Sequence, residues 1–347
     1  MTIGPKGIGP KGFKASIATA ILLIVIVFSF QFSKNKTSDA ETLKVLSYSS
    51  FLASWGPGPE IAKLFKEQTG IEVIYQDADD AGLLLTKLEL FPSDVVVGLD
   101  SISSFEARAK FKWKPHGRLQ TTNWTKGFSY DDPEFVAFDW APLTFIYRKG
   151  EITPPINLDD LLDVRFKNQI SLQDPRTSAP GLQFLYWLVA VKGEDQAFEF
   201  LNKLRPNIRA ISPSWSTAYG LFQKGEAKLA FSYVTSPAYH WANEKDLRYQ
   251  ASELSEQHIY QVELAAIPEA CINCRGAKAF VDFLGSDQAQ EILMNKNIMY
   301  SVDEKLNAHS KMNFDKLPAL KVLAPEVLAP LIPKKKELIE RWKDLKL

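Results

Sequence analysis

The sequence predicts an α/β protein made of two lobes, and three observations carry this prediction. From residue 42 onward, short apolar runs typical of buried strands alternate with amphipathic stretches typical of helices, the pattern of a parallel sheet with helices on both faces. The chain has 347 residues, of which 46% are hydrophobic and 24% charged, enough for one large domain or two ordinary ones with real cores. An apolar segment at residues 135–149 separates two such α/β units, so the chain passes between the lobes more than once.

The first unit alternates strands and helices. Its first helix carries Ile61, Leu64 and Phe65 on one face and ends at Gly70, a common stop signal. We expect strands at residues 43–49, 71–76 and 93–100, and helices at 59–70, 79–90 and 101–111.

The crossover at residues 135–149 reads as two strand-like runs with Pro142 between them. After this crossover the chain forms the second unit and then returns to the first. We expect strands at 169–174, 208–212, 227–234 and 259–267, and helices at 158–164, 179–193, 195–204, 214–225, 236–244, 277–286 and 287–297, with a proline-punctuated linker and one amphipathic helix in the C-terminal stretch 323–347.

These elements give a division of the chain. Residues 1–40 form a signal or membrane anchor plus linker, 41–138 the first part of lobe 1, 139–255 lobe 2, and 256–347 the return to lobe 1 with the C-terminal helices. A ligand site between the lobes would collect loops at the ends of strands.

The N-terminal segment predicts export. Residues 15–32 contain no charge and would span about 27 Å as a helix, close to the hydrocarbon thickness of a bilayer. Lysines precede this run, so the N-terminus should stay cytoplasmic while the rest of the chain becomes periplasmic or extracytoplasmic. The length favours an uncleaved anchor in the inner membrane; a signal cleaved near Ser38 and Ala40 is the alternative.

The two cysteines of the chain, Cys271 and Cys274, form a lone CxxC. This spacing suits a redox pair, half of a zinc site or a short disulfide. The four histidines are scattered without ligand spacing, and no thioredoxin-like context surrounds the pair. In an exported domain a disulfide is the favoured interpretation.

Charge and motif content exclude several classes of function. The formal net charge is zero, so there is no basic footprint for nucleic acid, and we expect no nucleic-acid partner. The sequence has no GxSxG, P-loop, GxGxxG, HExxH or EF-hand motif, and it suggests neither a catalytic residue nor a metal site.

Two loops at strand ends are candidates for binding. The stretch SSFLASWGPGPEI, residues 49–61, places Trp55 before a Gly-Pro tetrad that neither strand nor helix can cross, although a rigid turn with Trp55 packed on the sheet would look the same. In SLQDPRTSAPGL, Ser178 or Thr177 can cap the following helix, whose N-terminus suits a phosphate or carboxylate.

A third group of loops carries aromatic residues at the ends of elements. Trp215 begins a helix, Tyr233 ends a strand, and Tyr239 lies in the first turn of a helix capped by Thr235 or Ser236. Rings in such positions more often line a crevice than a core. Together they could hold a flat or cationic ligand by stacking and cation–π attraction, at about 0.5–2 kcal/mol per contact.

In order and spacing, several segments resemble the periplasmic thiamine-binding proteins of bacterial ABC importers. The resemblance covers about residues 43–345 and is most specific at 173–240. The matching segments are SYSSF…WGPGP, DVVVGLD, FDW, QDPRTSAPGL, WSTAYGLFQKGE, SYVTSPAYH and QVELAA. It implies a type II periplasmic binding protein, with two α/β lobes and a hinge, that delivers its ligand to a membrane permease.

The resemblance also implies a ligand and a site. The ligand would be thiamine, thiamine monophosphate or thiamine diphosphate, bound without a further cofactor by a protein we expect to be monomeric. Trp215, Tyr233 and Tyr239 match the family's aromatic cage, and Tyr48 and Trp55 match its first-lobe wall. Ser178 and its neighbours match the end of the site that receives the hydroxyethyl or phosphate group. Ser236 is a further candidate for ligand binding.

Two positions depart from the family pattern. Ser49 stands where the family has an aspartate, so one acid of the cleft is lost, and Asp79-Asp80-Ala81 lacks the family's glycine. Because the thiazolium ring of thiamine is permanently cationic, the lost acid should weaken binding unless Asp80, Asp100 or Asp139 compensates for it.

Three other functions are alternatives. A ferric-iron binder of the same fold would use tyrosinates, for which Tyr233 and Tyr239 could serve. A thiamine-degrading enzyme would need a nucleophilic cysteine, but both cysteines lie outside the matched segments. An anchored sensor is suggested only by the N-terminal run, and no signalling domain follows it.

Overall fold

The computed structural model describes residues 1, 2, 4, 41–125 and 128–347. The predicted anchor at residues 15–32 lies outside the described residues. Within the described part of the chain, no helix is both long and apolar enough to cross a bilayer. Residues Thr42–Leu347 form one compact unit, and the paragraphs below concern this unit.

One mixed sheet runs through the unit, with the strand order β2-β1-β3-β9-β4-β7-β5-β6. Strands β1, β2 and β3 pair in parallel, as do β5, β6 and β7, while β9 and β4 run antiparallel to their neighbours. The strands of this path are β1 (Thr42–Ser47), β2 (Glu72–Asp77), β3 (Val95–Asp100), β4 (Phe135–Arg148), β5 (Ile170–Gln173), β6 (Ile208–Ser212), β7 (Leu229–Tyr233) and β9 (Tyr260–Ala266).

The helices follow the expected alternation closely. In α3, Ile61 and Phe65 are buried as the apolar face predicts, and Gly70 ends the helix in the left-handed conformation that glycine adopts readily. The main helices are α3 (Gly58–Thr69), α4 (Leu84–Leu90), α5 (Ser103–Lys110), α6 (Ala179–Lys192), α7 (Glu194–Leu204), α8 (Trp215–Gln223), α10 (Cys274–Leu284), α11 (Asp287–Lys296) and α14 (Lys335–Leu345); short helical turns include α2 (Ser49–Leu52) and α9 (Ser236–Tyr239).

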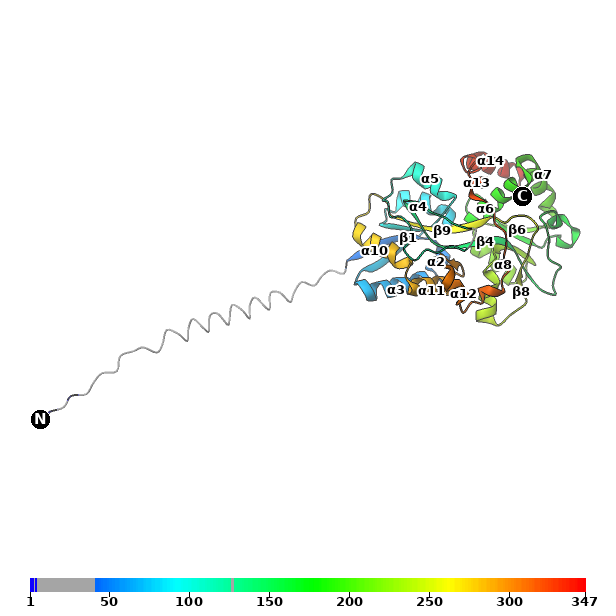
Figure 1. The fold of residues 1–347 in the computed structure, drawn as a ribbon. Coiled ribbons are helices and arrows are strands. Elements are labelled where there is room, and N and C mark those ends of the chain that lie inside the picture. Colours follow the sequence, from blue (N-terminus) through cyan, green and yellow to red (C-terminus); the bar gives the residue numbers. More distant parts are fainter. Residues whose placement is uncertain (3, 5–40, 126–127) are drawn as a thin grey trace. The chain divides into compact units, whose positions relative to one another are not determined.

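Two large hydrophobic cores lie on this sheet. The first collects buried side chains from residues 43–140 and 260–302, and the second from residues 143–259 and 323–342 together with Ile102. Strands β4 and β9 pair side by side in the middle of the unit (Figure 1); β4 contributes to both cores and β9 to the first. The C-terminal helix α14 packs on the second core through Leu338 and Trp342.

The predicted break at Pro142 is wrong, because β4 is one strand of 14 residues. Residues Phe135–Pro142 pair with β9, and Leu143–Tyr147 pair with β7. Pro142 therefore stands where the strand changes partner, and its carbonyl accepts a hydrogen bond from Val234 N–H at 2.8 Å. A missing N–H matters little at such a position, so proline does not end the strand.

The helix expected at residues 158–164 is also different. Two short 3₁₀ turns, Asp159–Leu162 and Val164–Phe166, meet at Asp163, which has extended backbone angles and accepts a hydrogen bond from Arg165 N–H. Two further short strands were not expected: β8 (Tyr249–Ala251) and β10 (Tyr300–Ser301) both pair with β4.

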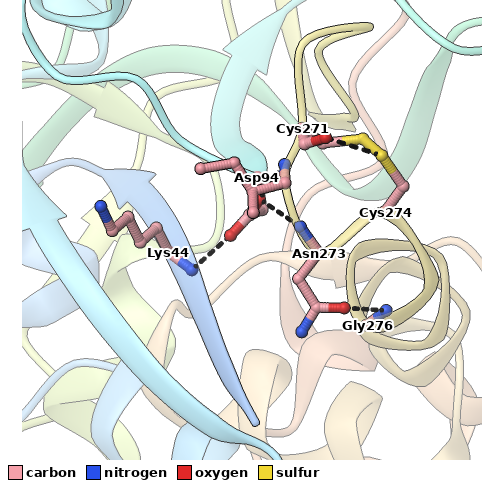
Figure 2. Close-up of a disulfide and its surroundings, with 7 residues drawn as sticks. Lys44, Asp94, Cys271, Asn273, Cys274 and Gly276 are labelled. Atoms are coloured by element: carbon pink, nitrogen blue, oxygen red, sulfur yellow. Dashed lines mark hydrogen bonds between the residues drawn. A yellow bond between two sulfur atoms is a disulfide. The ribbon is translucent and has the colours of Figure 1, made fainter.

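The favoured interpretation of the CxxC is confirmed, because Cys271 and Cys274 are joined by a disulfide (Figure 2). The carboxylate of Asp94 holds the turn between them by accepting hydrogen bonds from Ile272 N–H at 2.7 Å and Asn273 N–H at 2.9 Å. The same carboxylate accepts a hydrogen bond from the backbone N–H of Lys44 on β1 at 2.9 Å, so Asp94 connects the disulfide turn to strand β1.

Candidate ligand-binding site

A cavity of about 300 Å³ opens between the two cores, at the ends of strands β1 and β7. This volume is at the lower end of the range for small-molecule pockets, which is about 300–1,000 Å³. The pocket is lined by Tyr48, Ser50, Trp55, Asp80, Ala81, Pro180, Trp215, Ser216, Tyr219, Gln223, Tyr233, Ser236, Tyr239, Gln261, Glu263, Lys296, Asn297, Ile298 and Met299.

The aromatic wall on the side of the second core is built around Trp215, the first residue of α8. Its indole ring stacks on Tyr219, with 5.3 Å between ring centres and 13° between planes, and Tyr233 leans against it at 6.1 Å. The indole N–H donates to Ser232 Oγ at 2.8 Å. Because Tyr219 lies one helical turn beyond Trp215, the helix itself sets this stack.

Ser236 and Tyr239 come from the short helix α9 and extend this wall. The hydroxyl of Ser236 is hydrogen-bonded to that of Ser232 at 2.8 Å, so it lies one bond away from the indole of Trp215. Tyr239 is 36% exposed and packs edge-on against His240. On the opposite side of the pocket, Trp55 is 54% exposed and therefore leaves much of its ring available for a ligand.

Asp80 connects the two sides of the pocket. It follows β2 in the first half of the unit, yet its carboxylate accepts hydrogen bonds from the N–H of Ala179 at 3.2 Å and of Trp215 at 3.3 Å, the first residues of α6 and α8. A third N–H, of Gly82, donates at 3.0 Å. Burial raises the pKa of Asp80, and these N–H groups act in the opposite direction.

The prediction that Ser178 or Thr177 caps α6 through its side chain is wrong. Ser178 occupies the N-cap position and is buried, but its hydroxyl makes no cap hydrogen bond. Asp80 performs this role across the pocket. Gly82 allows the approach, because a Cβ at this position would lie 2.8 Å from the carbonyl oxygen of Thr177. The glycine needed at this loop is thus Gly82, next to the Ala81 that departs from the family pattern.

The floor of the pocket is formed by polar groups on β9 and its neighbours. Glu263 accepts hydrogen bonds from the hydroxyl of Tyr48 at 2.7 Å and from the side-chain amide of Gln261 at 2.9 Å. Asn297, the residue after α11, donates to Asp139 at 2.7 Å and to Glu263 at 3.3 Å. Glu263 therefore faces the pocket while Asp139 lies fully buried next to it.

Burial dominates the electrostatics of this floor. It disfavours the charged form, so it raises the pKa of Glu263 to about 7 and raises that of Asp139, which the nearby Glu263 raises further. Burial and the same carboxylates hold the pKa of the Tyr48 and Tyr233 hydroxyls well above the ordinary value. Both tyrosines therefore act as neutral hydrogen-bond donors.

Seven of the ten predicted site residues line the pocket together: Tyr48, Trp55, Asp80, Trp215, Tyr233, Ser236 and Tyr239. The other three do not. Asp100 is buried behind Gln183, whose amide donates to it at 3.0 Å, and it accepts from the N–H of Ser103 at the start of α5. Asp139 and Ser178 are buried next to the pocket without lining it.

Ser49 does not face the pocket. Its hydroxyl donates to the carboxylate of Asp77 at 2.8 Å on the exposed side of the loop, and its neighbour Ser50 lines the pocket instead.

Sequence reasoning missed Glu263, Gln261 and Asn297. The signal for Glu263 was present, because an acid in the middle of the apolar strand QVELAA is unusual and needs partners. Gln261 precedes it by two residues and so shares its face of the strand. Nothing in the local pattern marks Asn297, which follows α11 and reaches the floor only in the folded chain.

The arrangement suits a flat, positively charged organic ligand. Aromatic faces line opposite sides, neutral donors and acceptors lie between them, and carboxylates lie below. Among the described residues, no group of three or more His, Cys, Asp and Glu side chains could hold a metal ion.

Comparison with known proteins agrees with this architecture. Residues 56–296 match the family model of the bacterial extracellular solute-binding protein. The thiamine-binding periplasmic proteins of Brucella suis and Escherichia coli are each 36% identical to this chain; the alignments cover 80% and 79% of this chain and 84% of each relative.

Solved structures match over most of the chain. A periplasmic thiamin binding protein superposes with a TM-score of 0.80 at 34% identity, over 88% of this chain and 96% of the other. A ferric binding protein from Campylobacter jejuni, at 20% identity, shares the fold, with a TM-score of 0.70 over 87% of this chain and 99% of the other. These matches confirm the predicted α/β fold of type II periplasmic binding proteins. The chain therefore belongs to the bacterial extracellular solute-binding protein family.

Proposed function

We propose that this protein captures thiamine, or one of its phosphates, between its two halves and delivers it to the permease of an ABC importer. The observation that carries the proposal is the combination of aromatic walls with an acidic floor in one cavity. Thiamine has a cationic thiazolium and a flat aminopyrimidine, and these walls and this floor supply stacking, cation–π attraction and hydrogen bonds. The relatives named thiamine-binding at 36% identity support the same ligand.

Each core would act as a lobe, with β4 and β9 as the hinge between them. A ligand favours the closed form only if it contacts both lobes. The pocket meets this requirement, since Tyr48 and Trp55 come from the first half of the unit and Trp215 and Tyr239 from the second. The names of the relatives support a periplasmic location, where the closed protein would dock on its permease as a monomer without a further cofactor.

The ferric-iron alternative receives less support. Tyr233, one of the two tyrosines suggested as iron ligands, has its pKa raised by burial and by nearby carboxylates, so its ionisation is disfavoured. Tyr233 also donates its hydroxyl hydrogen to Gln261 at 3.0 Å. The ferric binding proteins that share the fold are 15–20% identical to this chain, which supports a common fold alone.

We further propose binding without turnover. A thiamine-degrading enzyme would need a free cysteine nucleophile at the ligand, whereas Cys271 and Cys274 are joined to each other and neither lines the pocket. The named relatives at 36% identity are binding proteins.

Calorimetric titration with thiamine, its monophosphate and its diphosphate tests the proposal and ranks the three ligands. We expect saturable binding of at least one form at one site per chain. Native mass spectrometry of the protein as purified gives an independent readout, because tight binders retain their ligand. Absence of binding to all three forms would refute the proposal, a coloured iron complex would favour the alternative, and loss of intact thiamine on long incubation would indicate an enzyme.

A further inference from the structure

Two buried carboxyl groups lie next to each other under the pocket. Asp139 and Glu263 are register partners on the antiparallel strands β4 and β9, so their side chains lie on the same face of the sheet at one level. They share one amide, because Asn297 donates to both of them. Asp139 is 0% and Glu263 3% exposed.

No cation of the described residues neutralises this pair. The hydrogen-bond donors to Glu263 are the hydroxyl of Tyr48 and the amides of Gln261 and Asn297, all neutral groups. Within the described residues, Asp139 Oδ1 has no hydrogen-bond partner, and neither carboxyl group takes part in an ion pair.

The titratable and charged groups around Glu263 are mostly acidic or neutral. Lys296 on α11 lines the same pocket, but its ammonium group pairs with Glu60 on α3 at 3.4 Å. The groups on the surrounding elements are Tyr48 before α2, Asp80 after β2, Asp100 at the end of β3, Asp139 on β4, Tyr233 at the end of β7 and Lys296 on α11.

Two carboxylates this close in a buried site cannot both ionise without a large cost. Burial raises the pKa of both groups, and that of Glu263 reaches about 7. Glu263 therefore holds a proton below about pH 7 in the ligand-free protein. A cation placed above Glu263 reverses this preference, because an opposite charge favours the ionised form.

We propose that the Asp139–Glu263 pair is the counter-charge for the cationic ligand and exchanges its shared proton for that ligand. This inference rests on the proposed function. On binding, the O–H bond of the protonated carboxyl breaks, its electron pair stays on the oxygen, and the proton leaves to solvent. The pair changes from one negative charge to two as one positive charge enters, so the net charge inside the site is the same before and after binding.

The exchange has a measurable pH dependence. Below the pKa of Glu263, the complex with thiamine holds one proton fewer than the free protein. The affinity for thiamine therefore increases by up to about tenfold for each unit by which the pH is raised. Above this pKa, the affinity levels off.

Calorimetry with thiamine tests the exchange directly. Titrations of the wild type, one pH unit below the pKa of Glu263, in two buffers of different ionisation enthalpy, should show release of up to one proton per thiamine. Glu263→Gln should release close to none and bind more weakly. Glu151→Gln is the matched control, because Glu151 pairs with Arg148 away from this pocket, and it should behave as the wild type. Equal heats in both buffers for the wild type would overturn the proposal.

A second variant and a ligand-free measurement keep the test decisive. If Glu263→Gln does not fold, Asp139→Asn should reduce the release, because Glu263 then loses the neighbouring acid and only its own burial still favours the protonated form. Without ligand, the raised pKa means that the folded state holds the proton more strongly than the unfolded state. The stability of the wild type relative to Glu263→Gln should therefore fall as pH rises from the ordinary 4.5 to about 7. If the stability difference between the wild type and Glu263→Gln does not change with pH, the proposed proton-sharing pair is wrong. If this difference falls as expected but the protein does not bind thiamine, the proposed function is wrong instead.

Discussion

Replacing Trp215 by alanine tests the aromatic wall most directly. One face of the indole ring is occupied by Tyr219, at 5.3 Å and 13°, and the ring lines the pocket. A ligand can therefore gain one stacking or cation–π contact from it, which is about 0.5–2 kcal/mol. At 0.59 kcal/mol for RT, this energy corresponds to a dissociation constant about 2- to 30-fold higher in the variant.

The same substitution also affects the fold, and the two effects must be separated. Loss of the Trp215–Tyr219 pair should lower the free energy of unfolding by about 0.5–1.5 kcal/mol beyond the lost burial. Calorimetric titration with thiamine should therefore be made at a temperature where circular dichroism shows the variant fully folded. Trp215→Phe keeps a ring in place and should recover most of the affinity.

Trp124→Ala is a matched control, because Trp124 packs against Phe128 in the first core and does not line the pocket. It should leave the affinity for thiamine unchanged. A dissociation constant for folded Trp215→Ala within experimental error of the wild type would refute the reasoning, and an equal loss in Trp124→Ala would show that the effect is one of stability alone.

Three further changes have defined outcomes. Replacing Cys271 and Cys274 by serine should lower the free energy of unfolding in urea by about 2 kcal/mol, from the entropy of the short loop they close, and an unchanged urea midpoint would contradict this. Gly98→Ala should destabilise the fold by at least about 1 kcal/mol and weaken thiamine binding, because φ is +102° and a Cβ would lie 2.3 Å from the ring of Tyr48; a melting temperature equal to that of the wild type would show that the ring moves freely. Asp80→Asn should raise the dissociation constant about tenfold by weakening the charge-assisted hydrogen bonds, about 1.5 kcal/mol, that join the two sides of the pocket, and small-angle scattering should show a less closed ligand-bound form. Unchanged affinity and scattering would contradict the last expectation.

Most of the elements could be predicted because local patterns determine them. The apolar face of α3, the stop at Gly70 and the buried run of β3 each depend on residues within one element. The placement of Trp215 at the start of a helix and of Tyr233 at the end of a strand followed from the same boundaries. Aromatic residues at such boundaries were therefore the best guide to the pocket.

The errors occurred where a distant partner changes the local rule. Proline normally interrupts a strand, but Pro142 stands at a change of partner and β4 continues. Serine normally caps a helix, but at α6 the acceptor is Asp80, almost a hundred residues earlier. Neither outcome is visible without the paired strand or the opposing loop.

The sequence by itself determined the alternation of strands and helices, the disulfide as the favoured state of the CxxC, and the aromatic residues of the wall. Each of these depends on neighbours within about ten residues or on the chemistry of single side chains. The tertiary structure decided the acidic floor, since Asp139 and Glu263 meet only because β4 and β9 pair in one register. It also decided that Asp100 and Ser178 lie outside the pocket lining and that Ser49 faces away from it. The physical reason is that burial and electrostatic coupling depend on three-dimensional neighbours, which the periodicity of a single element does not contain.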